Sequence, residues 1–280
     1  ESMTISVLMS VYKSEKPEFL AQALKSVWEE QTCKPAQIVL IEDGPLTAGL
    51  YTVIDRYKDI LGDRMCICRN ETNQGLTKSL NIGLRQVTSE LVARMDSDDR
   101  AAPRRFERQA AFLEQHPDVD IVGGFLQEFD TQHECLNVRH YPLTPQEARK
   151  YIVKASPLAH PAVMMRRRIF QSGLKYDERY PTSQDIQLWF DALMAGYQIA
   201  NIPQVVLYFR REGDVFKRRS RAKAKNEFKI YMKGIYRMKG LMTLSYKYPI
   251  ARYVFRNLPT AWVKCIYGSR LRNRVLEQKQ

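Results

Sequence analysis

The sequence predicts an α/β fold with a mostly parallel central sheet, followed by a basic C-terminal helical extension. In the first 122 residues, short apolar runs typical of strands alternate with segments whose apolar residues recur at helix spacing. Repeats of this kind join parallel strands through right-handed crossovers and place helices on both faces of the sheet. The charge is divided unevenly: residues 211–280 carry 19 Lys and Arg against 4 Asp and Glu, and residues 1–210 carry 25 against 27. We therefore expect a near-neutral body and a separate basic tail.

Each expected element has a local reason in the sequence. Pro17 opens the first helical pattern, because proline suits the first turn of a helix, where its missing N–H is not needed. The run Ile38–Ile41 is continuously apolar and stops at the turn sequence Glu42–Pro45, as expected for a buried strand. By the same criteria we expect strands at Thr4–Met9, Ile38–Ile41, Met65–Cys68, Leu91–Met95 and Val119–Val122, and helices at Pro17–Trp28, Leu46–Leu61, Gly75–Val87 and Pro103–Gln115.

The alternating pattern is weaker after Val122. Residues 123–160 favour turns and short strands, residues 181–196 have helical spacing, and Val205–Phe209 has the composition of a closing strand. No apolar run approaches the roughly 18 residues that a membrane-spanning helix needs. The five cysteines are odd in number and scattered, which indicates reduced thiols rather than a disulfide framework.

Polar clusters follow three of the predicted strands, at the points where these strands end. The clusters are Ser10–Tyr12, Glu42–Asp43 and Asp96–Asp99. The carboxyl ends of parallel strands lie at one edge of a sheet, where α/β proteins bind their ligands. The sequence lacks the Gly-rich dinucleotide loop, the P-loop and the G-x-S-x-G elbow, and its four histidines have no metal-ligand spacing. We therefore expect the chemistry at this edge to depend on carboxylates.

The pair Asp96 and Asp98 has two interpretations at this level. Carboxylates at a strand end can bind a hard divalent cation through oxygen. Alternatively, an Asp-rich turn caps the helix that follows. A second D-x-D sequence, Asp118-Val119-Asp120, comes directly after Pro117 and before a predicted strand, and we expect it to be a solvated turn.

Five sequence motifs occur in an order that resembles a known enzyme family. They are Ser6–Tyr12, Ile41–Gly44, Asn73–Leu76 with Leu80–Leu84, Arg94–Asp99 and Gln184–Trp189. Together they resemble the family 2 inverting glycosyltransferases with a GT-A fold, a Rossmann-like architecture, over about residues 4–210. The resemblance is strongest to bacterial enzymes that build exopolysaccharide of the amylovoran type, capsule or O-antigen. It implies a GT-A domain at 1–210, with a nucleotide-binding part at about 1–122 and an acceptor-binding part at about 123–210.

The resemblance implies that the donor substrate is a UDP-sugar, held first by its base. Tyr12 matches the aromatic position that packs on uracil, and Ser10 belongs to the same motif. Asp43 matches the carboxylate that accepts the uracil N–H. The alternatives are a tyrosine at the edge of the core and an aspartate that caps a helix.

The resemblance also implies a divalent metal, Mn²⁺ or Mg²⁺, beside the diphosphate. Asp98 is similar to the direct metal ligand, and Asp96 to the carboxylate that contacts ribose or metal-bound water. The metal would neutralise charge on the departing diphosphate. Lys78 is a further candidate for contact with the diphosphate, with a solvated helix lysine as the alternative.

On the acceptor side, the resemblance implies a catalytic base. Asp185 matches it, because inversion by direct displacement requires a carboxylate to take the acceptor proton; alternatively it is a first-turn aspartate stabilised by the helix dipole. Gln184 stands where many relatives have Glu, and is a candidate for an acceptor hydrogen bond. Trp189 is a candidate for stacking on an acceptor sugar, or a core residue. His160 is a candidate for contact with diphosphate or acceptor, or a structural histidine.

The basic tail, residues 211–280, has helical periodicity of its own. Its first segment has an apolar face of Phe228, Tyr231, Ile235, Met238 and Met242, nearly opposite Lys225, Lys229, Lys233 and Arg237. A second segment, about Ala251–Arg274, mixes aromatic and basic residues, a composition that suits an anionic bilayer surface. Acceptors of such enzymes are usually linked to a polyprenyl diphosphate. We therefore expect a peripheral protein on the cytoplasmic face of the bacterial inner membrane; the alternative is a helix pair packed on the body.

Two other functions remain as alternatives. A nucleotidyltransferase that makes sugar nucleotides is disfavoured because no Gly-rich phosphate loop follows the first strand. A non-enzymatic nucleic-acid-binding protein would explain the basic tail but not Asp96, Asp98 and Asp185, since a carboxylate edge repels phosphates. We therefore expect no nucleic acid partner.

Overall fold

The computed structural model describes residues 3–211 and 221–257, and the chain divides into two units, Glu1–Gly213 and Asp214–Gln280. The strands are β1 (Ile5–Val11), β2 (Gln37–Glu42), β3 (Met65–Arg69), β4 (Leu91–Asp96), β5 (Arg100–Ala101), β6 (Val119–Phe129), β7 (Asn137–Arg139), β8 (Met164–Arg166) and β9 (Gln198–Arg210). The helices of the first unit are α1 (Pro17–Val27), α2 (Ala48–Leu61), α3 (Leu76–Leu84), α4 (Arg105–Gln115), α5 (Pro145–Tyr151), α6 (Arg168–Gln171) and α7 (Gln184–Met194), with short 3-10 turns η1 (Gly62–Arg64) and η2 (His160–Ala162).

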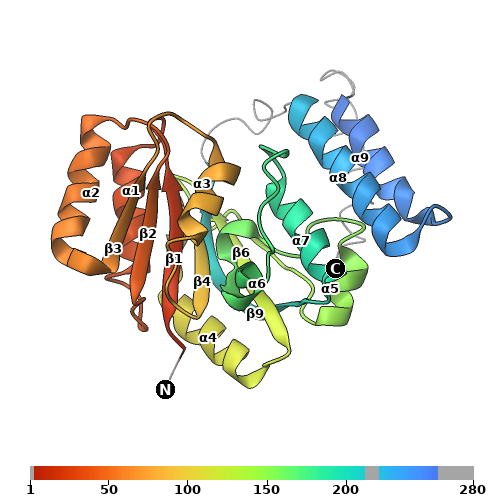
Figure 1. Cartoon of the computed structure of the whole chain (residues 1–280), viewed down its shortest axis with the longest axis horizontal. Helices are drawn as coiled ribbons and strands as arrows, with labels where there is room; N and C mark the ends of the chain where they lie inside the picture. The colour runs from red at the N-terminus through yellow and green to blue at the C-terminus, as the bar shows by residue number, and fades with distance from the viewer. Residues whose placement is uncertain (1–2, 212–220, 258–280) are drawn as a thin grey trace. The chain divides into compact units, whose positions relative to one another are not determined.

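The first four strands form the parallel half of one sheet, as the sequence predicts. The order across the sheet is β3-β2-β1-β4-β8-β6-β9-β5, with β7 paired to β6 (Figure 1). β1 is parallel to both β2 and β4, and β3 is parallel to β2. β1 is apolar over nearly its whole length, because a strand inside a parallel sheet is covered on both faces.

Helices cover both faces of this half of the sheet. Figure 1 shows α1 and α2 on one side of β1–β3 and α3 on the other. On the α3 side, a Cβ added to Gly83 would lie 2.4 Å from Leu8 Cδ1 and 2.5 Å from Ile41 Cδ1. Glycine therefore allows α3 to lie directly against β1 and β2, and this contact fixes the position of the helix at the edge of the sheet where these strands end.

The second half of the unit is mixed rather than parallel. β6 and β9 form a long parallel pair, whereas β8 is antiparallel to β4 and β6, and β5 is antiparallel to β9. The sequence predicted turns and short strands for residues 123–160, and this was wrong for α5. Thr144 and Glu147 form a capping box at the start of α5. These hydrogen bonds stabilise a helix whose apolar periodicity is weak.

The prediction of a solvated turn for the second D-x-D sequence holds for Asp118 but is wrong for Asp120. Asp118 is exposed, but Asp120 lies in β6 and is 5% exposed. Its carboxylate pairs with Arg168 Nη2 at 2.9 Å and accepts a hydrogen bond of 3.1 Å from the Gln198 backbone N–H. Asp120 therefore joins β6 to α6 and β9, a structural role that requires a partner 48 residues away.

The second unit contains a helical hairpin. It consists of α8 (Arg221–Lys239), the 3-10 turn η4 (Leu244–Tyr246) and α9 (Lys247–Asn257). Tyr231 and Ile235 on α8 are buried, and the Phe228 ring lies 4.7 Å from the Tyr253 ring on α9. The predicted apolar face is therefore largely used in packing α8 on α9. Its last member was predicted wrongly, because α8 ends at Lys239 and Met242 lies beyond it, 99% exposed.

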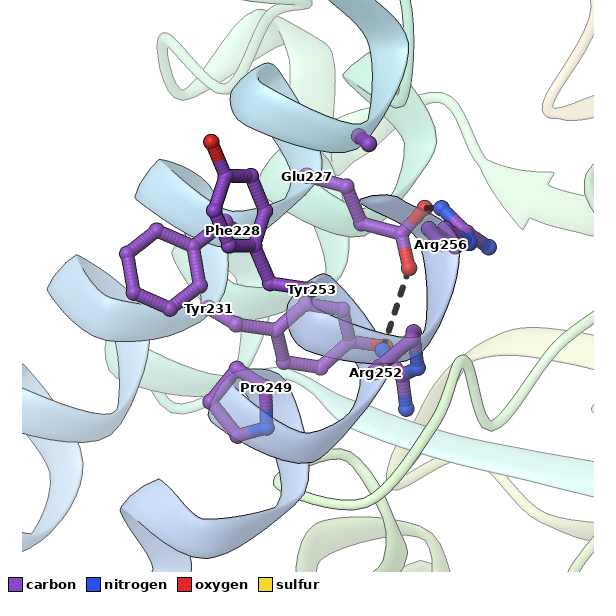
Figure 2. Close-up of a pocket in the computed structure, with 8 residues that line it drawn as sticks. Glu227, Phe228, Tyr231, Pro249, Arg252, Tyr253 and Arg256 are labelled. Carbon is purple, nitrogen blue, oxygen red and sulfur yellow. Dashed lines mark hydrogen bonds and ion pairs between the residues drawn. The ribbon is translucent and has the colours of Figure 1, made fainter. Parts of the chain in front are cut away.

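A buried ion pair also joins the two helices. Glu227 on α8 is 7% exposed, and its carboxylate contacts Arg252, at 3.1 Å, and Arg256 on α9 (Figure 2). The guanidinium of Arg252 lies 4.7 Å from the centre of the Tyr231 ring. Of the predicted segment Ala251–Arg274, the part from residue 258 onward lies outside the described residues.

Candidate active site

The parallel register brings the three predicted polar clusters to one edge of the sheet. Ser10 at the end of β1 is aligned with Asp96 at the end of β4, and Val11 is aligned with Glu42 at the end of β2. The prediction that the strand ends meet is confirmed. The site is therefore built on strands held by backbone ladders, with the functional side chains in the loops that follow.

Three carboxylates gather where β4 ends. Oxygen atoms of Asp96, Asp98 and Asp99 lie within 4.8 Å of one another. Burial, together with the charges of Asp96 and Glu15, raises the pKa of Asp98 to about 6. Burial and the charges of Asp96 and Asp98 raise the pKa of Asp99 well above its usual value. Carboxylates crowded in this way favour a proton or a cation, because ionisation of all three is otherwise costly.

The donor set of this cluster fits a hard divalent cation. All three residues offer carboxylate oxygen, the ligand type that Mg²⁺ and Mn²⁺ prefer. Asp99 Oδ2 is buried and, among residues 3–211 and 221–257, has no hydrogen-bond partner. A buried oxygen without a donor is expensive unless a cation or proton meets it. Asp96, Asp98 and Asp99 are therefore the residues that would hold a metal.

Arg210, at the end of β9, fixes the loop that carries these carboxylates. Its backbone N–H donates to Asp99 Oδ1 at 2.8 Å, and its Nε donates to the Asp98 carbonyl oxygen at 2.7 Å. The guanidinium lies 3.9 Å from the centre of the Phe19 ring. On the other side of the loop, Ser97 Oγ donates to Glu15 at 2.6 Å. The loop is thus held by β9 and by the segment between β1 and α1.

Arg94 lies beneath the acidic cluster, on β4. It is 2% exposed, and its Nη2 contacts Asp96 Oδ1 at 2.6 Å. In the described part of the chain, its Nε and Nη1 have no hydrogen-bond partner. A buried guanidinium without full hydrogen bonding is retained at a cost, which its attraction to the neighbouring carboxylates offsets. Arg94 therefore supplies the positive charge that makes the cluster compatible with folding.

Replacing Arg94 with methionine is expected to lower the free energy of unfolding by about 3 kcal/mol, because it leaves the buried side of Asp96 without its counter-charge. Urea denaturation measures this loss. The matched control is Arg104→Met, which removes an exposed pair with Glu107; its effect should stay below about 0.5 kcal/mol. Equal losses in the two variants would contradict the role assigned to Arg94.

Asp43 holds the loop before α3. Its Oδ1 accepts hydrogen bonds from the backbone N–H of Gln74, at 2.7 Å, and from Asn70 Nδ2, at 3.0 Å; its Oδ2 accepts from the backbone N–H of Gly75, at 3.0 Å. A carboxylate has about four acceptor positions, so one remains for a ligand. Gly44, at φ 86°, keeps the backbone close: a Cβ there would lie 2.8 Å from the Asn73 nitrogen. Asp43 caps neither neighbouring helix, because the N-cap residues of α2 and α3 are Thr47 and Gly75; its carboxylate instead fixes the loop before α3, and binding to uracil stays a prediction.

The other predicted donor residues differ in exposure. Tyr12, just after β1, is 48% exposed. Ser10 lies at the end of β1, partly buried. Lys78 is exposed in the first turn of α3, three residues after Gly75, whose backbone N–H is bonded to Asp43. Their contacts with a sugar nucleotide stay predictions.

Asp185 lies in the first turn of α7, as the sequence predicts. The residue before the helix, Ser183, has a left-handed backbone at φ 60°, which is costly for a residue with a side chain and marks a constrained turn. Tyr176 connects this region electrostatically to the acidic cluster. Burial raises the pKa of the Tyr176 hydroxyl, and the charges of both Asp185 and Asp96 add to this effect. Both carboxylates therefore lie near one buried hydroxyl.

Helix α3 holds the loop that leads to Asp185. Asn81 exchanges hydrogen bonds with the backbone of Tyr176: its Nδ2 donates to the carbonyl oxygen at 2.9 Å, and its Oδ1 accepts from the N–H at 3.0 Å. Thr77 Oγ1 donates to the Tyr180 carbonyl oxygen at 2.9 Å. The helix whose preceding loop is held by Asp43 therefore also positions the segment that leads to Asp185.

The three predicted acceptor residues are all buried. Trp189 is fully buried, and it offers no ring face to a sugar; the core alternative is correct, and the stacking prediction is withdrawn. His160 is buried, with Nε2 2.8 Å from the Tyr176 hydroxyl and its ring against Trp189. Burial and the charge of Arg94 lower the pKa of His160 well below its usual value, so the ring is neutral. Gln184 is 5% exposed at the start of α7.

Sequence reasoning missed four residues that build the site: Glu15, Asp99, Tyr176 and Arg210. Asp99 belongs to the Asp96–Asp99 cluster and was available from it. Arg210 is the last residue before the basic tail. Among so many neighbouring Lys and Arg residues, the sequence did not indicate that this one belongs to the site. Tyr176 and Glu15 act through partners distant in sequence, which no local pattern indicates.

The sheet has the GT-A fold, with an acidic cluster at the carboxyl end of β4. A model of the family "Glycosyl transferase family 2" matches residues 6–174, and the chain belongs to this family. It is 36% identical over 228 residues to "Amylovoran biosynthesis glycosyltransferase AmsE" of Erwinia amylovora, covering 81% of this chain and 84% of that one.

Two further proteins are informative. "UDP-Gal:alpha-D-GlcNAc-diphosphoundecaprenol beta-1,3-galactosyltransferase" of Escherichia coli is 33% identical over 214 residues, 76% of each chain. The structure of the mannosyltransferase PcManGT from Pyrobaculum calidifontis, in complex with GDP-Man and Mn²⁺, superimposes with a TM-score of 0.65 at 16% identity, over 100% of this chain and 80% of that one. At this identity the superposition shows the shared fold.

Proposed function

We propose that this enzyme transfers a sugar from a UDP-sugar to a glycan acceptor linked to a polyprenyl diphosphate, with inversion, in bacterial surface polysaccharide synthesis. The observation that carries the proposal is the group of Asp96, Asp98 and Asp99 at the carboxyl end of β4. The amylovoran enzyme and the galactosyltransferase named for a UDP donor and a diphosphoundecaprenol acceptor support the choice of substrates.

The donor would bind at the edge of the parallel strands. The exposed Tyr12 ring packs on the base, and the remaining acceptor position of Asp43 receives a base N–H, which favours uracil. Asp96, Asp98 and Asp99 would hold Mn²⁺ or Mg²⁺, which when bound neutralises negative charge on the diphosphate. Ser10 and Lys78 would contact ribose or diphosphate oxygens.

The acceptor would bind on the side of α7. Asp185 accepts the proton of the attacking hydroxyl as the new bond forms between that oxygen and the anomeric carbon. The bond from the anomeric carbon to the diphosphate oxygen breaks in the same step, so the configuration inverts and UDP leaves. Arg94 and Arg210 keep the acidic loop in place during this displacement. Tyr176 and His160 form the buried floor between the two sides.

The second unit supports a membrane-bound location for this reaction. Between residues 221 and 257 there are 10 Lys and Arg, and Glu227 is the one acidic residue. Such a segment is attracted to anionic lipid. The enzyme would therefore act as a peripheral protein at the cytoplasmic face of the inner membrane, where a lipid-linked acceptor is found. None of the helices described is both long and apolar enough to cross a bilayer.

Product analysis tests the proposal. UDP-sugars, with GDP-mannose as a comparison, are incubated with Mn²⁺ or Mg²⁺ and diphosphate-lipid acceptors of different terminal sugars. The expected products are a glycoside of inverted configuration and UDP, formed only with metal. Exchange of pyrophosphate into the sugar nucleotide would identify a nucleotidyltransferase instead. Retention of configuration would overturn the role of Asp185.

A further inference from the structure

The tip of the α8–α9 hairpin exposes three large apolar side chains within four consecutive residues. Leu241 is 76% exposed, Met242 is 99% exposed and Leu244 is 84% exposed. Farther along the hairpin, by contrast, Tyr231 and Ile235 are buried and Phe228 packs on Tyr253. Among residues 221–257, the most exposed apolar side chains are therefore at the turn.

The polar groups of this tip are bonded to one another. The Tyr246 hydroxyl donates to the Gly240 carbonyl oxygen at 2.9 Å, and the Ser245 N–H donates to Thr243 Oγ1 at 3.2 Å. Ser245 Oγ also accepts from Lys239 Nζ at 3.2 Å. Gly240, at φ 73°, ends α8 with its N–H donating to the Tyr236 carbonyl oxygen at 2.8 Å. The turn thus satisfies much of its own hydrogen bonding and can enter an apolar medium at lower cost.

Positive charge surrounds the apolar tip. Lys239 and Lys247 are the residues on either side of it, and both are exposed. The one carboxylate of segment 221–257, Glu227, is buried between Arg252 and Arg256 and presents little negative charge to a surface. An apolar projection ringed by cations matches a leaflet of anionic lipid, with acyl chains below and phosphates above.

We propose that the tip, residues 240–246, inserts into an anionic bilayer while Lys239 and Lys247 contact lipid phosphates. This inference rests on the proposed function and sharpens it. The anchoring element is the turn between the helices, whereas Phe228 and Tyr231 of α8 pack on Tyr253 and Arg252 of α9. The apolar contact with the bilayer then comes from the side chains of Leu241, Met242 and Leu244.

Vesicle co-sedimentation of the full chain tests the insertion. The vesicles contain phosphatidylglycerol and phosphatidylethanolamine, with phosphatidylcholine vesicles as the neutral comparison. The variant Leu241→Ser/Met242→Ser/Leu244→Ser is expected to bind the anionic vesicles at least about tenfold more weakly than the parent. The matched control is Ile250→Ser/Val254→Ser, which removes exposed apolar side chains of α9; its affinity should stay within about twofold. Unchanged binding of the triple variant would overturn the proposal.

Depth is measured separately. Met242→Trp is expected to be quenched by lipids brominated in the acyl chain, beyond the quenching of the native tryptophans. Lys225→Trp, exposed near the other end of α8, is the control and should show no added quenching. Equal quenching at both positions would indicate that the whole helix lies on the membrane, and would overturn insertion by the tip.

The experiments also distinguish membrane insertion from sugar transfer and from self-association of the chain. Vesicle binding is measured without nucleotide or acceptor, so it stands or falls independently of whether the enzyme transfers sugar. Sedimentation velocity shows whether the triple variant changes the oligomeric state. If the parent is a dimer, the variant a monomer and vesicle binding equal, then the tip contacts a second copy of the chain and the proposal is wrong.

Discussion

Replacing Asp98 with asparagine is expected to lower kcat/KM about 10³-fold, near the upper range for the loss of one electrostatic stabiliser of a transition state. The amide keeps the shape of the side chain but removes one of the three negative charges in the cluster. Metal binding should weaken in parallel. Electron paramagnetic resonance of Mn²⁺ measures this directly, in the absence of a sugar nucleotide, so that binding and turnover are separated.

The same substitution is expected to stabilise the metal-free protein. The pKa of Asp98 is raised to about 6 in the folded state, from an ordinary value of 3.8. Between these values the folded state binds more protons than the unfolded state, so stability falls as pH rises from about 4 to about 6. The penalty is complete above that range. This rise in pKa corresponds to roughly 3 kcal/mol at most, and solvent screens part of it because Asp98 is partly exposed. At pH 7.5, Asp98→Asn should therefore raise the free energy of unfolding by about 1 to 2 kcal/mol, and at pH 4 by nearly nothing.

The chain contains its own control for Asp98. Asp118 begins the second D-x-D sequence and is exposed, so Asp118→Asn should change neither kcat/KM nor Mn²⁺ binding. Urea denaturation at the two pH values checks the stability change. An Asp98→Asn enzyme that keeps full activity and ignores EDTA would refute the metal site at the end of β4.

Replacing Asp185 with asparagine is expected to lower kcat by about 10² to 10⁴-fold, the range for loss of a positioned general base. On the donor side, Asp43, Arg94 and Arg210 hold the site from the ends of β2, β4 and β9. Binding of UDP, measured by calorimetry, and binding of Mn²⁺ should therefore stay close to those of the parent.

The control for Asp185 lies on the same helix. Asp191 accepts a hydrogen bond from Gln187 at 2.9 Å, within α7, and Asp191→Asn should leave kcat nearly unchanged. If Asp185→Asn also loses UDP binding, the carboxylate maintains the fold of the site and is not the base. An acceptor with a more acidic hydroxyl depends less on a general base. If such an acceptor fully restores turnover by Asp185→Asn, the result supports the role of Asp185 in proton removal.

The parallel half of the fold could be predicted because its signals are local. Ile38–Ile41 is apolar without interruption, and a strand covered on both faces requires this. Asp96 and Asp98 were found for the same reason: they follow such a strand directly. Helix α5 was not predicted, since Ala148 is its one buried residue and its apolar spacing is therefore weak. Its capping residues, Thr144 and Glu147, could have indicated the start of the helix from the sequence.

The remainder of the site depends on contacts over long sequence distances. Arg210 meets Asp99 across 111 residues, and Asn81 meets Tyr176 across 95. Asp120 was interpreted as solvated because its partner, Arg168, lies on another element. Trp189 shows the same limit: helical spacing placed it on α7, but the burial of its ring depends on His160 and on the packing around it.

The bonds from Thr77 and Asn81 to the 176–180 segment have a consequence for redesign of this enzyme. The loop before α3 is held by Asp43, the residue proposed to recognise the nucleobase. The same helix braces the segment that leads to Asp185, the proposed base. The proposed nucleobase side and the proposed acceptor side are thus joined through α3. Grafting residues 70–76 from a guanosine-specific homologue would shift both at once, and a swap intended to alter only the donor should carry 176–185 with it.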